Sequence, residues 1–541
     1  ELTAQPRTIS PAAIILEVED PALWSCDAPN LYTMRTVVLE NGTELDTYDT
    51  VFGFRTLAYT MEGLLLNGAP VKFKGVCAHE DHANLGVAVP DDVRKRRMQM
   101  LKFIGCNAYR CSHNPPTPEV LDLCDQLGLL VMDENRWFDS SEEGLRQLTH
   151  MMRRDRNHPC VVMWSMANEE PLQGTERGQN MMRSMMFTAR RFDDTRPIMM
   201  AMSGDCQNAG GVAGVSDVIG INYLIEQYDE IHRKFPDTPL VASEIGGKML
   251  PYGIMGDGSG EDWEAVNTRP YFMGMFKWVA FGYRGESRGW PRIYSRSGII
   301  EPTAIPKENT WFYKQMWDET ESFAKLWPPH WNWTGKEGEM VTVKAYTNGD
   351  TLALYQDGCL VEKKTVNPYR RTTFQVPYHP GTLRVEAYRD GKLWATDVLA
   401  TTGSPITLEV ESSASTLRAD RVNTCIVDLY AVDAAGRRVL WAENRIHLTL
   451  EGPATLLAVS NNDPYDAMGA TDPDRKLFGG HCQVIFRTTA EPGEIRLTAS
   501  GQGLTPAVLT LNSEACLRAP HVAQELETDA MWYFAKMDGP H

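Results

Sequence analysis

Two glutamates follow short apolar runs that have the character of buried strands. Residues 161–164 (VVMW) are soon followed by Asn168-Glu169-Glu170, and residues 241–243 (VAS) lead directly to Glu244. Runs this short and apolar are typical of strands in a parallel sheet covered on both faces. Two carboxylates facing each other across a pocket are what glycoside hydrolysis requires, one as acid and one as base or nucleophile. Glu169 and Glu244 are therefore the first candidates for catalysis.

Other expected strands also end in polar clusters. His79-Glu80-Asp81-His82 follows one of them, and Arg110-Cys111-Ser112-His113-Asn114 forms the end of the next. A structural interpretation competes with the catalytic one, because carboxylates at strand ends also cap helices and pair with arginine. A metal site at residues 79–82 is a third interpretation, since histidines and carboxylates cluster there. It is the weakest, because no third histidine with ligand spacing lies nearby.

The elements that would position these residues alternate between strands and amphipathic helices. This alternation predicts a parallel sheet, and eight strands within residues 58–322 fit a (β/α)8 barrel. In such a barrel strands four and seven lie on opposite sides of the mouth, so Glu169 and Glu244 would face each other. An open doubly wound sheet would need a glycine-rich phosphate turn after an early strand, and the sequence has none. The expected strands are residues 71–76, 107–110, 129–132, 161–164, 197–202, 218–222, 239–242 and 275–281.

The segments on either side of the barrel have all-β patterns. Residues 1–57 predict part of an immunoglobulin-like β-sandwich, with strands near 13–18, 31–39 and 48–54 and a turn at Asn41-Gly42. Too few strands are present for a complete sandwich, so we expect an upstream part to be missing. Residues 323–403 and 404–513 predict two further sandwiches, the second immunoglobulin-like, and residues 514–541 a C-terminal tail.

Composition limits the kinds of partner. The net charge of −18 argues against binding the phosphate backbone of nucleic acids. Eleven cysteines, odd in number and without a CxxC pair, are typical of a reducing compartment, so we expect a cytoplasmic protein. No apolar segment is long enough to span a membrane. We expect no cofactor.

Ordered motifs over nearly the whole chain resemble glycoside hydrolase family 2, which includes β-galactosidases, β-glucuronidases and β-mannosidases. The motifs are Gly53-Phe54-Arg55, Leu66-Asn67-Gly68, Lys74-Gly75-Val76, His79-Glu80-Asp81-His82, residues 107–113 (NAYRCSH), residues 123–129 (LCDQLGL), Met132-Asp133-Glu134 and residues 154–159 (RDRNHP). The resemblance implies a retaining mechanism on a (β/α)8 barrel flanked by sandwiches. Within the family it is closest to β-galactosidases with two extra C-terminal immunoglobulin-like domains.

The resemblance also implies roles for single residues. Glu169 matches the general acid/base, with Glu170 as the neighbour that could be mistaken for it, and Glu244 matches the nucleophile. Tyr223 matches a tyrosine that hydrogen-bonds the nucleophile, Arg110 an arginine that orients it, and Asn168 a contact to the sugar 2-hydroxyl. The whole expected substrate-binding set is His79, Asp81, Arg110, His113, Glu134, Trp137, Asn168, Tyr223 and Trp278.

The sequence departs from the family at two informative places. Some members hold Mg²⁺ with a Glu-x-His after the third strand, but this chain has Glu134-Asn135-Arg136, so we expect no metal. β-Glucuronidases carry an Asn-x-Lys for the substrate carboxylate, whereas residues 306–309 read Pro-Lys-Glu-Asn. We therefore expect a retaining exo-β-galactosidase with a carbohydrate substrate. A β-glucuronidase or another family 2 exo-glycosidase is the alternative, and a non-catalytic carbohydrate-binding fragment is the alternative of another class. Further partners would be a second copy of the chain or the missing N-terminal segment.

Overall fold

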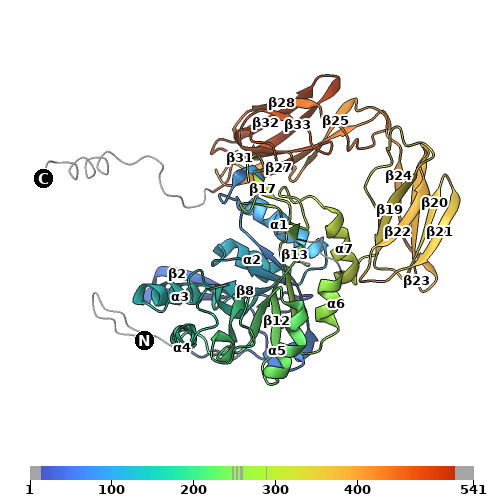
Figure 1. Ribbon diagram of the computed structural model, residues 1–541. Coiled ribbons are helices and arrows are strands. Elements are labelled where there is room, and N and C mark those ends of the chain that lie inside the picture. The colour runs from blue at the N-terminus through green and yellow to red at the C-terminus, as the bar shows by residue number, and fades with distance from the viewer. Residues whose placement is uncertain (1–13, 247–248, 251–253, 256–259, 288, 518–541) are drawn as a thin grey trace.

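A closed barrel of eight parallel strands forms the centre of the computed structural model (Figure 1), as the sequence predicts. The structure describes residues 14–246, 249–250, 254–255, 260–287 and 289–517. Strands that follow one another in the chain are neighbours in the barrel. The barrel strands are β6 (Phe73–Ala78), β7 (Ala108–Cys111), β8 (Leu130–Glu134), β9 (Val161–Asn168), β10 (Ile198–Met202), β11 (Ile219–Asn222), β12 (Leu240–Ile245) and β15 (Phe272–Lys277).

The barrel strands are buried because side chains fill the barrel interior and helices cover its outside. In β9, for example, every residue is buried until the half-buried Asn168 at its end. The described helices are α1 (Asp91–Phe103), α2 (Pro118–Leu127), α3 (Glu142–Asp155), α4 (Glu176–Arg190), α5 (Tyr228–Lys234), α6 (Glu261–Asn267) and α7 (Glu308–Trp317), with 3-10 turns η1 (Ala83–Leu85), η2 (Val212–Gly214) and η3 (Ile225–Gln227).

The starts of two helices depart from simple capping. α2 begins after Thr117 and ends at the left-handed Gly128 as its sequence predicts, but the Thr117 side chain makes no capping hydrogen bond. The amide of Thr117 itself donates to Glu80 Oε1 at 2.9 Å. The Asp-rich start of α1 does not cap the helix either, because Pro90 occupies the cap position. Asp92 instead accepts from the Thr424 amide of the last sandwich at 2.8 Å.

The N-terminal part is a β-hairpin followed by a small sheet. β1 (Tyr32–Glu40) and β2 (Thr43–Phe52) pair around Asn41 and Gly42, whose φ angles of 49° and 81° suit a tight hairpin turn. Residues 14–18 form no strand, contrary to expectation, and residue 13 lies outside the described part. Alternation alone was misleading there, because the described residues offer these positions no strand partner. The unanticipated sheet β3 (Leu57–Thr60), β4 (Gly63–Leu66), β5 (Ala69–Val71) contributes Leu64 and Leu66 to the barrel core.

Two β-sandwiches follow the barrel, each with its own apolar core. The tight turns at Asp357-Gly358 and Asp390-Gly391 adopt left-handed conformations. The tail lies outside the described residues from position 518 on. The first sandwich consists of β18 (Ala324–Trp327), β19 (Met340–Thr347), β20 (Thr351–Gln356), β21 (Cys359–Thr365), β22 (Thr372–Pro377), β23 (Thr382–Arg389) and β24 (Lys392–Ala400). The second consists of β25 (Thr407–Ser412), β26 (Thr416–Arg418), β27 (Thr424–Val432), β28 (Arg445–Glu451), β29 (Ala454–Ser460), β30 (Asp474–Lys476), β31 (His481–Thr488), β32 (Gly493–Gly501) and β33 (Leu504–Glu514).

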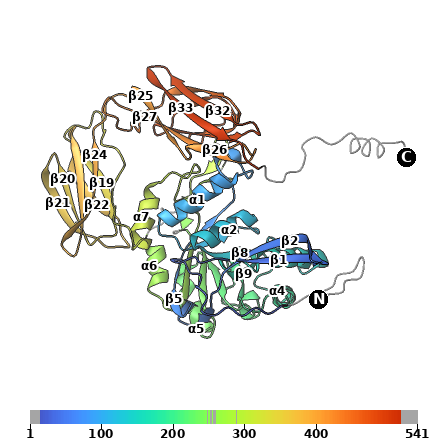
Figure 2. The ribbon, with the colours of Figure 1, turned by 180° about the vertical axis from the view of Figure 1, so that it is seen from behind.

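The last sandwich returns to the barrel and lies against α1, as both ribbon views show (Figure 1, Figure 2). A small buried cluster joins the two bodies: Val89 and Val93 from the barrel side pack with Ile426, Ala458 and Ile485 of the sandwich. Short hairpins complete the described structure: β13 (Met249–Leu250) with β14 (Ile254–Met255), and β16 (Tyr283–Arg284) with β17 (Tyr294–Ser295). Within the described ranges no helix has the length and apolar character needed to cross a bilayer.

Candidate active site

A buried arginine at the end of β7 connects the polar side chains of the barrel mouth. Arg110 is fully buried and donates to Glu134 Oε2 at 2.7 Å and to Glu244 Oε1 at 2.8 Å. It also donates to Asn168 Oδ1 at 2.8 Å and to the Ser243 carbonyl at 3.0 Å. One guanidinium therefore connects the ends of four strands, β7, β8, β9 and β12. Its donors are all directed at fixed acceptors, which makes it rigid.

Glu244, near the end of β12, is a buried carboxylate held at both oxygens. Oε1 accepts from Arg110, and Oε2 accepts from the Tyr223 hydroxyl at 3.0 Å. His113 Nε2 lies 3.6 Å from Oε1. Burial raises the pKa of Glu244 above its usual range, while Arg110 and His113 favour the ionised form and oppose that rise. The carboxylate is thus held in one orientation, and the opposite charges near it only partly offset the effect of burial.

Glu169 occupies the position just after β9 and is exposed at the mouth. Its backbone is left-handed, with φ of 52°, and its amide donates to the Ala201 carbonyl of β10 at 2.8 Å. Its Oε1 accepts from Asn222 Nδ2 at 2.9 Å. Glu170 is half-buried; burial raises its pKa, and the charge of Arg136 opposes the rise. Of the two adjacent glutamates, Glu169 is the one whose carboxylate is hydrogen-bonded to a strand-end side chain, that of Asn222.

Asn222, the last residue of β11, was not among the expected site residues. Its Nδ2 donates to Glu169 Oε1 and to Asn168 Oδ1 at 3.1 Å, and its Oδ1 accepts from Ser243 Oγ at 2.7 Å. Because Asn168 in turn accepts from Arg110, an unbroken set of hydrogen bonds joins Glu169 to Glu244. Its place at the end of an apolar strand, beside Tyr223, was the signal that could have identified it.

Glu134 is fully buried and accepts hydrogen bonds from three side chains. These are Arg110, His113 Nδ1 at 3.0 Å, and Ser165 Oγ at 2.8 Å. Burial by itself would raise its pKa, but Arg110 and His113 outweigh burial and hold the pKa below its usual range. Glu134 is therefore a fixed anion that orients Arg110 and His113. Glu134, expected in the substrate-binding set, is thus placed to support the pocket through hydrogen bonds.

A cavity of about 550 Å³ is lined by His79, Asp81, His113 and Trp278 of the expected sugar-binding residues. Glu169 and Glu244 are not among its lining residues, but His113, on its wall, lies 3.6 Å from Glu244. His113 stacks on Trp278 with ring centroids 5.2 Å apart, and His79 meets the same indole edge-on at 5.3 Å. Burial lowers the pKa of His79 to about 4, so its ring is neutral near pH 7. Asp81 is buried on the wall and accepts from the Arg284 amide at 2.8 Å. Tyr283 and Glu286, hydrogen-bonded to each other, also line the cavity.

Trp137 lies apart from this cavity. It is 55% exposed, on the segment after β8, and the Arg136 guanidinium lies 4.8 Å from its ring centre. The structure therefore does not bring it together with His79, His113 and Trp278.

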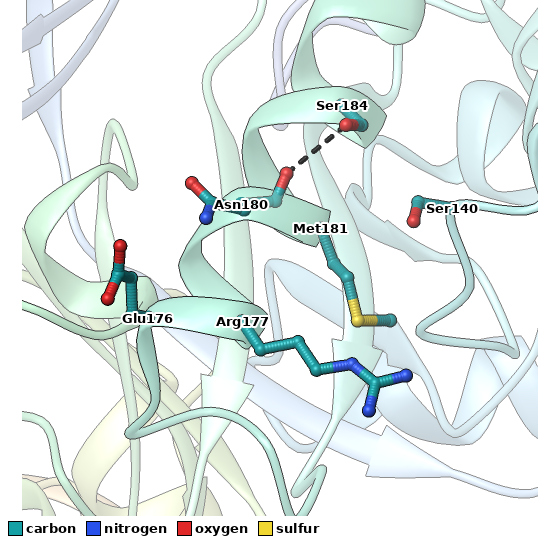
Figure 3. Close-up of a pocket in the computed structure, with 6 residues that line it drawn as sticks. All are labelled: Ser140, Glu176, Arg177, Asn180, Met181 and Ser184. Atoms are coloured by element: carbon teal, nitrogen blue, oxygen red, sulfur yellow. Dashed lines mark hydrogen bonds between the residues drawn. The ribbon is translucent and has the colours of Figure 1, made fainter.

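A separate hollow of about 450 Å³ lies along α4 (Figure 3), where Ser184 donates to the Asn180 carbonyl, and none of the expected site residues lines it. Its lining residues are Ser140, Glu176, Arg177, Asn180, Met181 and Ser184.

The residues of the 79–82 cluster have different partners and do not converge on one point. Asp81 faces Arg284, whereas His82 bonds Gln483 of the last sandwich. In the described part of the chain, Asp125, His158 and Cys160 do lie close enough together to bind a metal. They sit at the opposite edge of the barrel, before β9, and Asp125 is already bonded to His158 at 2.6 Å and to the Cys160 amide at 2.9 Å. Because Asp125 is already bonded within the group, we interpret these three residues as a structural cluster.

The comparisons with known proteins agree with this geometry. Family models for glycosyl hydrolases family 2 match residues 2–55, and their TIM barrel domain matches residues 58–143 and 139–265. The glycoside hydrolase family 2 C-terminal domain 5 matches residues 408–510, and a domain of unknown function matches residues 338–395.

Curated relatives include a beta-galactosidase of Bacteroides ovatus, 30% identical, with 92% of this chain and 68% of the relative aligned. A beta-glucuronidase of Formosa agariphila is 23% identical, with 92% of this chain and 53% of the relative aligned. The chain thus spans about half to two thirds of the length of these relatives.

Solved structures give the same assignment. A family 2 glycosyl hydrolase of Bacteroides cellulosilyticus has a TM-score of 0.85 and 26% identity over 91% of this chain and 69% of that chain. A beta-glycosidase of Bacteroides vulgatus has a TM-score of 0.82 and 28% identity over 91% of this chain and 70% of that chain. On these similarities the chain belongs to glycoside hydrolase family 2, the family of these β-glycosidases.

Proposed function

We propose that the protein is a retaining exo-β-galactosidase in which Glu244 is the nucleophile and Glu169 the general acid/base. The observation that carries the proposal is the set of hydrogen bonds from Glu169 through Asn222, Asn168 and Arg110 to Glu244. It fixes two carboxyl groups of unlike environment at one barrel mouth. A retaining glycosidase requires such a pair, about 5–5.5 Å apart, on either side of the anomeric carbon.

The environments divide the two roles. Glu244 is buried beside the cavity, and Arg110 and Tyr223 leave it little freedom to move, as suits attack on the anomeric carbon. Glu169 is exposed at the mouth, where it can protonate a departing aglycone and later take a proton from entering water. The charge of Glu169 also raises the pKa of Glu244. A proton on Glu169 therefore favours an ionised Glu244, which is the reactive combination.

The cavity suits a neutral sugar better than a uronic acid. Lys307 belongs to the Pro-Lys-Glu-Asn segment that was compared with the Asn-x-Lys of glucuronidases. Its Nζ donates to the carbonyls of Arg296 and Gly298 at 2.9 and 2.8 Å. It is thus already bonded to the backbone. Arg284 lines the cavity, but its Nε donates to the Ala83 carbonyl at 3.0 Å and its Nη2 to Asn84. The name of the Bacteroides ovatus relative points the same way.

A panel of nitrophenyl glycosides with three matched variants tests the proposal. We expect hydrolysis of the β-galactoside, with kcat reduced by at least about 10³-fold in Glu169→Gln and Glu244→Gln and little changed in Glu170→Gln. A 2-fluoro-galactoside should label Glu244 and no other residue. Labelling elsewhere would overturn the nucleophile assignment, and hydrolysis of the glucuronide alone would establish the alternative substrate. Binding of galactose without any hydrolysis would indicate a carbohydrate-binding protein.

A further inference from the structure

The loop after β6, residues 79–86, lies between the sugar cavity and the last sandwich. Its first residues, His79 to Asp81, line the cavity, whereas His82 and Asn84 bond to the sandwich. Asn84 Nδ2 donates to the Val459 carbonyl of β29 at 2.6 Å, and the Asn84 amide donates to Ser460 Oγ at 3.2 Å. The sandwich therefore forms the outer support of a loop whose inner side faces the substrate.

The strongest of these contacts is a buried pair between His82 and Gln483 of β31. Both side chains have no solvent exposure, and His82 Nε2 lies 2.9 Å from Gln483 Oε1. Burial lowers the pKa of His82 to about 3, so the ring is neutral at physiological pH and one ring nitrogen carries the proton donated to Gln483. The hydrogen bond between two neutral side chains such as these depends on their distance and orientation and not on charge.

Gln483 is itself fixed by two further bonds. Its Nε2 donates to Asp428 Oδ1 at 3.0 Å and to the Thr303 carbonyl, in the segment before α7, at 3.1 Å. Asp428 is held in turn by Arg96 of α1 at 2.7 Å and by His481 at 2.9 Å. The Gln483 side chain is thus fixed in one orientation by contacts from both the barrel and the sandwich.

We infer that His82 and Gln483 are positioning residues for the sugar-binding side of the cavity. The inference rests on the proposed function of that cavity. Without the His82 donor, Gln483 Oε1 would be a buried acceptor lacking a partner, which is unfavourable unless the loop moves. Movement of the loop displaces His79, three residues earlier, from its edge-on contact with Trp278, and Asp81 from the Arg284 amide. The last sandwich would thereby set affinity for the sugar without touching it.

The test compares His82→Phe, which keeps an aromatic ring but removes the donor, with His82→Gln, whose amide can still donate. The matched control is Asp92→Ala, which removes bonds to Asn423 and Thr424 across the same interface but not at the loop. We expect His82→Phe to raise KM about 2- to 30-fold with kcat little changed, which is the signature of lost sugar binding. His82→Gln should restore most of the affinity, and Asp92→Ala should leave KM unchanged.

Hydrogen exchange gives a second measurement that does not depend on turnover. Amides within residues 79–86, among them His82 bonded to the Gly86 carbonyl at 3.0 Å, should exchange faster in His82→Phe than in wild type or Asp92→Ala. Equal KM values and equal exchange in His82→Phe and wild type would overturn the inference while leaving the proposed function intact. If wild type hydrolyses no galactoside, the proposed function fails instead. The inference is then judged by the exchange rates and by galactose affinity from calorimetry.

Discussion

Arg110 shares its donors between two glutamates, and this sharing affects the pKa of Glu244, the proposed nucleophile. Glu134 and Glu244 both lie within 2.8 Å of the guanidinium, but Glu134 also has His113 and Ser165 as donors. The pKa of Glu134 accordingly falls below its usual range while that of Glu244 stays above it. Neighbouring carboxylates that share one cation thus differ in pKa, because Glu134 has His113 and Ser165 as further donors whereas Glu244 has Tyr223.

The pH dependence of activity follows from this difference. Glu244 must be ionised to attack, so kcat/KM should fall as the pH drops through its raised pKa, above the value of about 4.3 for an unperturbed glutamate. Arg110→Gln removes the cation that favours the carboxylate, so the acidic limb should move to higher pH and kcat/KM should fall at least tenfold. The pH profile of kcat/KM on a nitrophenyl galactoside measures both. Arg146→Gln, which removes an exposed arginine paired with Glu143, is the control and should leave the limb in place. A limb that moves to lower pH in Arg110→Gln would contradict the assignment.

Tyr223 donates the second bond to the nucleophile. Burial and the charge of Glu244 raise the pKa of Tyr223, so the phenol keeps its proton and remains a donor. Loss of a hydrogen bond to a charged group costs about 1.5–3 kcal/mol, so Tyr223→Phe should lower kcat about 10- to 150-fold. Tyr346→Phe is the matched control, because Tyr346 donates to Glu308 at 2.7 Å outside the barrel mouth. Steady-state kinetics should show a loss in the first variant and none in the second; equal kcat values in both would remove Tyr223 from the mechanism.

At the scale of elements, the strands themselves could be predicted from the sequence, but the contacts between their ends could not. All eight barrel strands were predictable because both faces are buried, which leaves short apolar runs between helices. The last was misplaced: β15 covers Phe272–Lys277 rather than residues 275–281. After it the Trp278 amide still donates to the Ile245 carbonyl of β12 at 2.8 Å, and the Ala280 amide donates to the Cys77 carbonyl of β6 at 2.9 Å. Apolar residues beyond Lys277 pack across the mouth and resemble a strand in sequence. Asn222 was missed for a related reason, since its role appears only when three strand ends meet.

Gly274 shows how closely β15 approaches β6. Its φ is +135°, and a Cβ at this position would lie 2.3 Å from the Phe73 nitrogen and 2.5 Å from the Phe73 oxygen. Gly274→Ala should therefore lower the free energy of unfolding by about 3 kcal/mol, through backbone strain and overpacking together. Gly358→Ala is the control, because Gly358 has a φ of +83° in open space and should lose only about 1 kcal/mol. Urea unfolding followed by fluorescence compares them. Equal losses would show that the contact between the strands relaxes easily.

At the scale of the whole molecule, the docking of the last sandwich had no sequence signal. Asp92 and Thr424 are 332 positions apart, and each looks like an ordinary helix-start or strand residue by itself. The contact becomes visible only when barrel and sandwich are both folded. Its consequence is that two bodies with separate cores also share a third, small core made of Val89, Val93, Ile426, Ala458 and Ile485. Stability of the sugar-binding loop should then depend on residues of the sandwich.

Adjacent residues of β31 separate the shared core from the sandwich's own core. Ile485 belongs to the cluster shared with α1, whereas Val484, on the other face of the strand, belongs to the sandwich core, and both are buried. Truncating a buried isoleucine to alanine costs about 2–5 kcal/mol. Because Ile485 packs in the shared core, Ile485→Ala should destabilise the neighbouring barrel elements as well. Hydrogen exchange should therefore be faster in α1 and residues 79–86. In Val484→Ala the faster exchange should be confined to β27, β29 and β31. If α1 exchanges equally fast in both variants, barrel and sandwich unfold as one unit and the small shared core has no separate effect.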